Sequence, residues 1–276
     1  ALPFSMLTLQ VAHATHAPVA ATMDAALRAA VRLPPQFSSL ILGSQSPSRR
    51  ALLAAALGYG DAEQVECIVP DIDEKAIGDR ASDPERLVLA VATAKADALV
   101  ARWGCLDAFS SLHATPRRKR ASQHPGVFSR SRLADEGRLS ELGRRGAVLV
   151  CGDQVVTYNG AVREKPADAD EARAYIADYG LAPCSTVGAL VLHDAASGRR
   201  ASGVHVAHIH FDPFPPAVVD ALAADPVCRR CAGGLMVEHP ACAPYLREID
   251  GGVDSVMGLS TRLLATLLGS LSDGAS

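Results

Sequence analysis

Three charged side chains occupy positions from which the sequence predicts a chemical site. Asp153 follows a buried-strand pattern that ends at Gly152, and α/β proteins place ligands and metals at the ends of such strands. Glu74 lies in an acidic loop, and Lys95 lies midway along a helix that is otherwise apolar. A lysine is rarely buried unless it is paired or used in chemistry. Each residue alone also fits a solvated acid or a lysine that reaches solvent, so only their combination indicates a site.

A second candidate feature is an anion site at the start of a helix. Ser44 and Ser46 belong to a turn of small residues, after which Arg49 opens a helix. Free backbone N–H groups, the positive end of the helix and the guanidinium would all face one anion. The segment is not a Walker A loop, because no Gly-Lys-Ser/Thr follows at the required spacing. The alternative is a capped helix start with surface arginines and no anion site, which would have the same sequence pattern.

Hydrophobic periodicity places these residues on strands and helices that alternate along the chain. Strands are predicted over residues 40–42, 65–69, 147–150, 154–158, 161–163, 185–192 and 203–211. Helices are predicted over residues 49–57, 84–102, 169–180, 216–224 and 259–271. Asn159-Gly160 predicts a hairpin turn, and hairpins beside alternating helices indicate an α/β protein with a mixed sheet.

The composition is that of a folded, soluble protein. The 276 residues carry 27 basic and 30 acidic side chains and are 49% hydrophobic, which rules out wholesale disorder. No run approaches the roughly 18–20 apolar residues of a membrane span. We expect a flexible leader over residues 1–38, one domain over residues 39–272 and a cytoplasmic location. The leader is rich in alanine and poor in acids, so it also fits an organelle targeting segment.

A basic block interrupts the predicted domain. Residues 101–146 hold ten basic and four acidic side chains, a local net charge of +6, so the rest of the chain carries −9. The block has no sustained period, which predicts an insertion over about residues 104–146. Its few aromatic residues are not interleaved with the arginines as base stacking requires. A solvated loop or a localisation signal is therefore favoured over a nucleic-acid site.

Seven cysteines, an odd number in a long chain, indicate a reduced protein without a disulfide framework. Four possible zinc ligands fall within 15 residues, but in a spacing that matches no known zinc finger: Cys228, Cys231, His239 and Cys242. Three histidines of one predicted strand fit an exposed strand face better than a metal site: His205, His208 and His210.

The candidate residues belong to motifs that follow one another in a recognisable order. From about residue 39 to residue 268 these are Ser44-Gln45-Ser46-Pro47-Ser48-Arg49, Asp73-Glu74, Val91-Ala92-Thr93-Ala94-Lys95-Ala96, Gly152-Asp153-Gln154, Lys165-Pro166, Cys231-Ala232-Gly233 and Gly258-Leu259. Together they resemble the Maf family of nucleoside triphosphate pyrophosphatases. Three positions depart from the family pattern: Ser48 stands for arginine, Val187 for threonine and Ser260 for proline.

The resemblance implies a fold, a reaction and roles for individual residues. The fold would be a central twisted mixed sheet flanked by helices, with a cleft between two lobes and often a homodimer. The reaction would split the α–β phosphoanhydride of a nucleoside triphosphate into a monophosphate and pyrophosphate. Asp153 and Glu74 would bind Mg²⁺ or Mn²⁺ and activate water. The resemblance assigns the phosphates to Arg49, Lys95, Lys165, Ser44 and Ser46.

The residues at three places in the sequence distinguish two branches of the resembled family. Asp153-Gln154, Cys231-Ala232-Gly233 and Glu238 resemble the branch of 7-methyl-GTP pyrophosphatases. The other branch, which acts on dTTP and UTP, has Asp-Thr and a late glutamine. Glu238 would accept hydrogen bonds from the N1–H and N2–H₂ donors of 7-methylguanine and complement its positive charge. The rival interpretations are a dTTP/UTP enzyme and a nucleic-acid-binding or cell-division regulatory protein that uses the basic insertion.

Overall fold

The computed structural model describes residues 31–81, 83–112 and 144–273. One seven-stranded sheet runs through this part of the chain in the order β2-β1-β3-β5-β6-β7, with β4 paired to β3. The strands are β1 (Ser39–Gly43), β2 (Glu66–Cys67), β3 (Ala147–Tyr158), β4 (Ala161–Arg163), β5 (Cys184–Asp194), β6 (Arg200–Phe211) and β7 (Leu246–Asp250). β1 is parallel to β2 and β3, whereas the other pairs are antiparallel. The predicted mixed sheet is confirmed.

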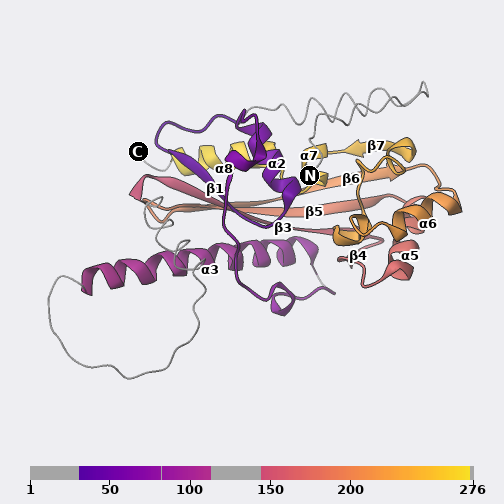
Figure 1. Cartoon of the computed structure of the whole chain (residues 1–276), viewed down its shortest axis with the longest axis horizontal. Helices are drawn as coiled ribbons and strands as arrows, with labels where there is room; N and C mark the ends of the chain where they lie inside the picture. Colours follow the sequence, from indigo (N-terminus) through magenta and orange to yellow (C-terminus); the bar gives the residue numbers. More distant parts are fainter. Residues whose placement is uncertain (1–30, 82, 113–143, 274–276) are drawn as a thin grey trace.

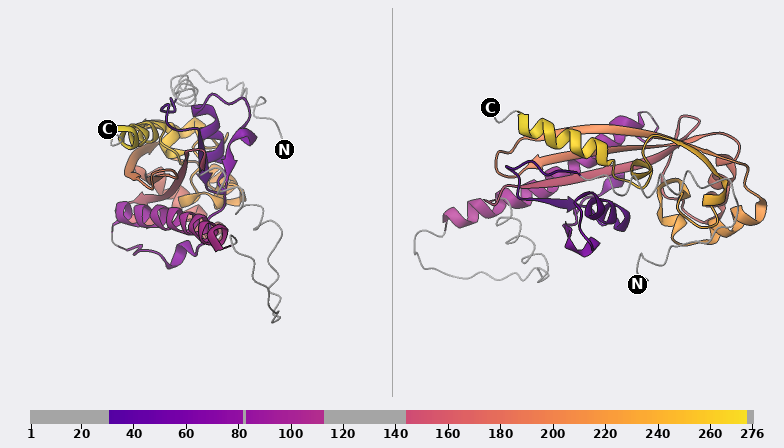
Figure 2. Two further views of the ribbon diagram at one scale, coloured as in Figure 1. Left: turned by 90° about the vertical axis from the view of Figure 1, so that its left-hand side faces the viewer. Right: turned by 90° about the horizontal axis from the view of Figure 1, so that it is seen from above.

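Helices cover both faces of this sheet. The α-helices are α2 (Pro47–Ala56), α3 (Pro84–Leu112), α5 (Ala169–Tyr179), α6 (Pro216–Ala224), α7 (Val253–Val256) and α8 (Thr261–Asp273). Short 3₁₀ turns are η2 (Ala62–Gln64), η3 (Glu74–Ala76), η4 (Cys228–Arg230), η5 (Ala232–Gly234) and η6 (Ala243–Tyr245). Figure 1 shows α3 along one face, α2 and α8 on the other, and α5 with α6 at one end of the long strands. The left view of Figure 2 shows the same layers from one end of the molecule. Within the described residues, no helix is long and apolar enough to cross a membrane.

Three apolar clusters hold these layers together. Alternate residues of β3 point to opposite faces, so Val148 and Val150 join the cluster under α2 and α8, whereas Leu149 and Cys151 join the cluster under α3. The third cluster lies beyond them, around Val156, with α5 and α6. The two ends of the molecule are therefore two lobes with separate cores, joined by the long strands β3, β5 and β6.

The main error in the predicted elements concerns β3. The sequence pattern ends a strand at Gly152 and starts a hairpin at Gln154, but β3 is continuous because β5 pairs with it from Val148 to Tyr158. The hairpin turn itself is confirmed: Asn159 and Gly160 have φ of 48° and 79°, as a type I′ turn requires.

Several boundaries also move. α3 continues to Leu112, ten residues past the predicted end of this helix at residue 102, and residues 113–143 of the predicted insertion lie outside the described part. Only Glu66–Cys67 of the predicted strand 65–69 forms β2. Residues 1–30 of the expected leader also lie outside the described part. Residues 31–38, the last part of the expected leader, pack against the domain, and Val31 and Phe37 are buried in the cluster under α2 and α8.

Candidate active site

The candidate site forms where β3 runs past the end of β1. The register of the parallel pair stops at Gly43 opposite Cys151. The carbonyl of the next residue, Gly152, instead accepts hydrogen bonds from two cationic side chains, at 3.1 Å from Arg49 Nη1 and 3.4 Å from Lys95 Nζ. Asp153 therefore lies within a strand, but beside a sheet edge that β1 has left open.

Ser44 and Ser46 build the start of α2. Ser46 is the N-cap, whose Oγ accepts a hydrogen bond from the backbone N–H of Arg49, and Pro47 is the first helical residue. The helix therefore starts two residues before the predicted Arg49. Ser44 Oγ accepts from the backbone N–H of Ser46 at 3.1 Å and from Arg49 Nη1 at 3.5 Å. Neither hydroxyl donates to another of the described residues, so both hydrogens can be donated to a ligand.

Arg49 is fixed between two backbone carbonyls from distant parts of the chain. Its Nε donates to the carbonyl of Gly258 at 2.9 Å, and its Nη1 donates to that of Gly152. Burial lowers the pKa of the Arg49 guanidinium, and the carboxylates of Asp153 and Glu74 raise it. An arginine stays protonated under such shifts, so the site holds a permanent positive charge.

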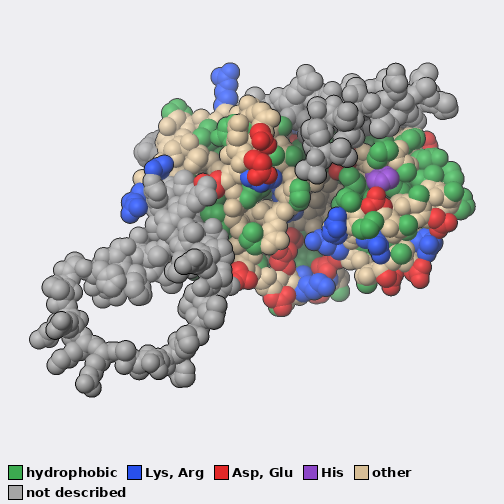
Figure 3. Space-filling view, in the orientation of Figure 1, with side chains coloured by type: hydrophobic (Ala, Val, Ile, Leu, Met, Phe, Trp, Pro, Cys, Tyr) green, Lys and Arg blue, Asp and Glu red, His purple; other side chains and the backbone are tan. Residues whose placement is uncertain are grey.

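Lys95 joins the two predicted carboxylates. Its Nζ lies 2.8 Å from Asp153 Oδ1 and 3.1 Å from Glu74 Oε2. The lysine is only 5% exposed and comes from the middle of α3, so the alternative of a lysine reaching solvent is wrong. Glu74 comes from η3, a turn capped by the side chain of Asp73. In Figure 3, acidic and basic side chains gather in the middle of the face shown, between the two ends of the molecule.

This arrangement fits a hard divalent cation beside a phosphate chain. Two carboxylates approach one ammonium group, and the side chain of Glu74 is 52% exposed while that of Asp153 is 14% exposed. Carboxylate oxygens are the ligands that Mg²⁺ and Mn²⁺ prefer. Arg49 and Lys95 add two positive charges next to the same oxygens, which suits an anionic substrate.

The remaining predicted residues are Gln154, which borders Arg49 beside Gly258, and Lys165 and Glu238. Gln154 Nε2 donates to the carbonyls of Ser255 and Val256 at 2.8 and 3.1 Å, so this amide nitrogen holds α7 in place. Lys165 is exposed and has no hydrogen bond or ion pair with any described residue. Glu238 is partly buried, which raises the pKa of its carboxyl group.

Lys165 and Glu238 both affect the pKa of one thiol in the second lobe, that of Cys231. Burial raises the pKa of the Cys231 thiol, Glu238 raises it further and Lys165 lowers it. Six predicted residues therefore meet at the sheet edge: Ser44, Ser46, Arg49, Glu74, Lys95 and Asp153. The neighbours of Lys165, Glu164 and Pro166, lie beside Gly233 and Gly234 in the second lobe.

The sequence did not predict the role of two backbone carbonyls or of Arg80 in this site. The carbonyls of Gly152 and Gly258 accept hydrogen bonds from the cationic side chains of Arg49 and Lys95. Both glycines belong to the family motifs, but a motif does not show which backbone carbonyl is used. Arg80 donates to the carbonyl of Glu74 at 2.7 Å, and it belongs to no periodic or motif pattern that would have revealed it.

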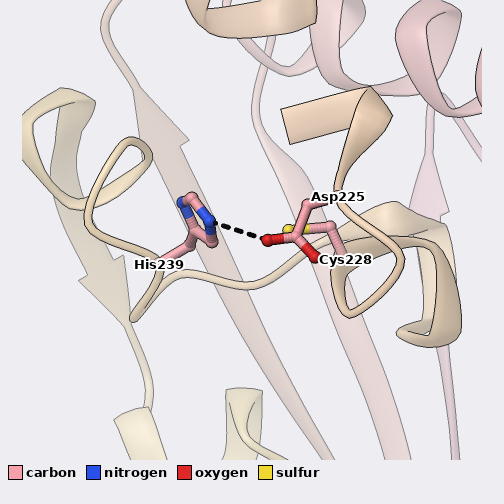
Figure 4. A group of neighbouring side chains, drawn as sticks. All are labelled: Asp225, Cys228 and His239. Carbon is pink, nitrogen blue, oxygen red and sulfur yellow. Dashed lines mark hydrogen bonds and ion pairs between the residues drawn. The ribbon is translucent and has the colours of Figure 1, made fainter. Parts of the chain in front are cut away.

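Two of the four possible zinc ligands, Cys228 and His239, come together with Asp225, which the sequence pattern did not include. Figure 4 shows Asp225, Cys228 and His239 together, with ligand atoms within 4.8 Å of one another. His239 Nδ1 accepts from the backbone N–H of Ala241 at 3.1 Å, so Nε2 carries the proton and donates to Asp225 Oδ2 at 3.2 Å. Burial, as the largest cause, raises the pKa of the Cys228 thiol to about 12, which keeps it protonated. These contacts describe a hydrogen-bonded turn.

The histidines of β6 divide between the two faces of the strand. His208 is exposed and its Nδ1 lies 2.8 Å from Ser185 Oγ, and His210 is partly exposed on the same face. The predicted exposed strand face is confirmed for these two residues. His205 lies on the opposite face, and its ring is so close to Gly188 that a Cβ there would meet it at 2.4 Å.

Comparisons with known proteins agree with the motifs. The family model of Maf-like proteins matches residues 39–271. A 7-methyl-GTP pyrophosphatase of Dictyostelium discoideum is 30% identical over 233 residues, covering 84% of this chain and 97% of the relative. A nucleoside triphosphate pyrophosphatase of Streptomyces coelicolor is 31% identical over 236 residues, which are 85% and 91% of the two chains. A dTTP/UTP pyrophosphatase of Burkholderia thailandensis is 27% identical over 245 residues, which are 85% and 93% of the two chains. With its mixed sheet and a match over most of its length, the chain belongs to the Maf family.

Proposed function

We propose that the protein is a nucleoside triphosphate pyrophosphatase that hydrolyses the α–β phosphoanhydride to a nucleoside monophosphate and pyrophosphate. The observation that carries this proposal is the convergence of Asp153, Glu74, Lys95 and Arg49 on the open edge of β3 in a Maf chain. The names of its relatives, all nucleotide pyrophosphatases, support the same reaction.

The site's charges match the demands of this reaction. Water must approach a phosphorus that is shielded by anionic oxygens, and the departing pyrophosphate gains negative charge. Arg49 and Lys95 hold the phosphates by direct charge contact, with Lys165 approaching from the second lobe, and the hydroxyls of Ser44 and Ser46 donate hydrogen bonds to them.

Asp153 is the proposed general base. Its carboxylate takes a proton from the attacking water as the new P–O bond forms and the bond to the bridging oxygen breaks. Asp153 and Glu74 would hold Mg²⁺ or Mn²⁺, which when bound neutralises phosphate charge and lowers the pKa of water. Lys95 orients both carboxylates through its ion pairs at 2.8 and 3.1 Å.

Substrate panels test the reaction directly. Purified full-length protein is given 7-methyl-GTP, GTP, dTTP and UTP, each with Mg²⁺ and with Mn²⁺, and the release of pyrophosphate and monophosphate is followed. We expect stoichiometric pyrophosphate from at least one nucleotide. Release of inorganic phosphate alone, or no turnover of any of the four, would overturn the proposal.

Within this reaction we propose a preference for 7-methyl-GTP. The support is the pair Asp153-Gln154, the Cys231-Ala232-Gly233 segment and Glu238, together with the Dictyostelium relative. Glu238 is partly buried in the second lobe, and burial raises the pKa of its carboxyl. A cationic base next to it would favour the ionised form and gain a charge-assisted contact.

Glu238→Gln tests this preference. The variant keeps the shape of the side chain but loses the charge, so the ratio of kcat/KM for 7-methyl-GTP to that for GTP should fall about tenfold, as expected for about 1.4 kcal/mol. Glu248→Gln, an exposed carboxylate on β7, is the matched control and should leave the ratio unchanged. An unaltered ratio in Glu238→Gln would remove Glu238 from base recognition.

A further inference from the structure

Arg80 makes an unusually complete set of contacts for a residue in a connecting loop. It lies between η3 and α3, and its Nη2 donates to the carbonyl of Glu74 at 2.7 Å. Its Nη1 donates to the carbonyls of Ile77 and Gly78. Its Nε lies 2.8 Å from Glu164 Oε1. One guanidinium therefore closes the turn that carries Glu74 and binds a segment 84 residues away.

Glu164 connects this contact to the second lobe. It follows β4 directly and precedes Lys165, so the ion pair fixes the backbone from which Lys165 projects. The carbonyl of Glu164 accepts a hydrogen bond from the backbone N–H of Gly233 at 2.7 Å. The chain of contacts thus runs from the loop of Glu74 through Arg80 and Glu164 to the Cys231-Ala232-Gly233 segment.

The turn that carries Glu74 has few other restraints. Its own backbone bonds are long, with Ala76 N 3.2 Å from the carbonyl of Asp73 and Ile77 N 3.3 Å from that of Glu74. The side chain of Glu74 is half exposed and forms an ion pair with Lys95. Without Arg80, the backbone of Glu74 would be held by a short capped turn alone.

Arg80 contributes little to stability by its charge. The side chains of Arg80 and Glu164 are 29% and 39% exposed, and ion pairs at such positions add little to the free energy of unfolding. The guanidinium instead fixes the geometry of the loop, because its rigid planar fork binds several acceptors at once. The single ammonium of a lysine cannot reproduce these contacts.

We propose that Arg80 is a positioning residue of the pyrophosphatase site: it holds Glu74 against Lys95 and Asp153 and, through Glu164, sets Lys165 at a fixed place relative to them. This inference rests on the proposed function. Arg80 touches none of the proposed reacting groups, and it acts through the backbone of Glu74 and the side chain of Glu164.

Arg80→Gln is the test, with Arg50→Gln as the matched control. Arg50 is also a partly buried arginine that binds one carboxylate, Glu63, and the carbonyls of Glu63 and Val65, but it holds η2 and none of the site residues. Full-length wild type and both variants are compared by kcat, KM, Mn²⁺ affinity from electron paramagnetic resonance, and Tm.

We expect Arg80→Gln to lower kcat and weaken Mn²⁺ binding by about 10- to 100-fold, the usual effect of losing a partner that orients a ligand. Arg80→Lys should recover less than half of the loss on a logarithmic scale, because it lacks the planar fork. Arg50→Gln should match wild type in kcat and Mn²⁺ affinity, and the two glutamine variants should have Tm values within a few degrees of each other.

Two outcomes would overturn the inference: wild-type kcat and Mn²⁺ affinity in Arg80→Gln, or equal losses in Arg80→Gln and Arg50→Gln. Glu164→Gln adds an independent measurement, since Arg80→Gln/Glu164→Gln should lose no more activity than Arg80→Gln if the two residues act as a unit. A wild-type protein that releases no pyrophosphate would instead overturn the proposed function, while the Mn²⁺ measurement still tests Arg80.

Discussion

Replacing Asp153 with asparagine removes one negative charge from the centre of the site and leaves its shape almost unchanged. The asparagine carbonyl oxygen can still accept the hydrogen bond that Lys95 Nζ now donates to Asp153 Oδ1 at 2.8 Å. Lys95 also keeps Glu74 Oε2 at 3.1 Å and the carbonyl of Gly152 at 3.4 Å. The substitution therefore separates the chemical role of the carboxylate from its role in packing.

The two effects differ in size. Loss of a well-placed general base costs about 10²- to 10⁴-fold in rate, which corresponds to about 3–5 kcal/mol of activation free energy. Removing one partner of a fully buried ion pair costs about 3–5 kcal/mol of stability. Because Lys95 retains three acceptors, we expect only about 1–2 kcal/mol here, or a fall in Tm of about 2–8 °C.

Initial rates of pyrophosphate release and thermal unfolding are measured on the same preparations. Lys95→Met serves as the comparison, because it leaves Asp153, whose side chain is only 14% exposed, without its cation. Asp153→Asn should show the greater loss of activity relative to its loss of Tm, and Lys95→Met the greater fall in Tm. A folded Asp153→Asn protein within tenfold of the wild-type rate would refute the assignment of Asp153 as the base.

Two further predictions concern the scaffold around the site. Burial lowers the pKa of His205 to about 4, below the unfolded value of 6.5, so the unfolded chain binds the proton first as the pH drops. The Tm of the wild type should therefore fall between pH 6.5 and pH 4. The Tm of His205→Gln should fall less steeply over that range, and parallel curves of Tm against pH for the two proteins would contradict this. Gly233→Ala should lose about 2–4 kcal/mol in urea unfolding, because φ is 62° and the new Cβ would meet Tyr179 Oη at 2.6 Å. The control Gly234→Ala has a similar φ of 63°, but the nearest atom to its new Cβ would be Pro166 Cγ at 3.6 Å, an ordinary contact. Its loss should therefore be about 1 kcal/mol, and equal losses would refute the steric argument.

The sequence determined the elements and the chemical inventory of this protein. Apolar periodicity and capping residues are local signals, so they located α2, α5, α6 and the hairpin turn at Asn159-Gly160 to within a few residues. The apolar context of Lys95 also pointed correctly to a buried, paired lysine. Such signals depend on neighbours a few positions away, which is why one sequence suffices to find them.

Only the tertiary structure decided how these pieces meet. β3 continues through Asp153 because β5 pairs along its whole length, and no local pattern contains that pairing. The end of β1 at Gly43 leaves the Gly152 carbonyl to Arg49 and Lys95, which depends on the register between strands about a hundred residues apart. The contact between Arg80 and Glu164 likewise needs two loops brought together by the sheet. Distances between residues far apart in sequence are set by packing, and these distances turn a list of charged residues into a site.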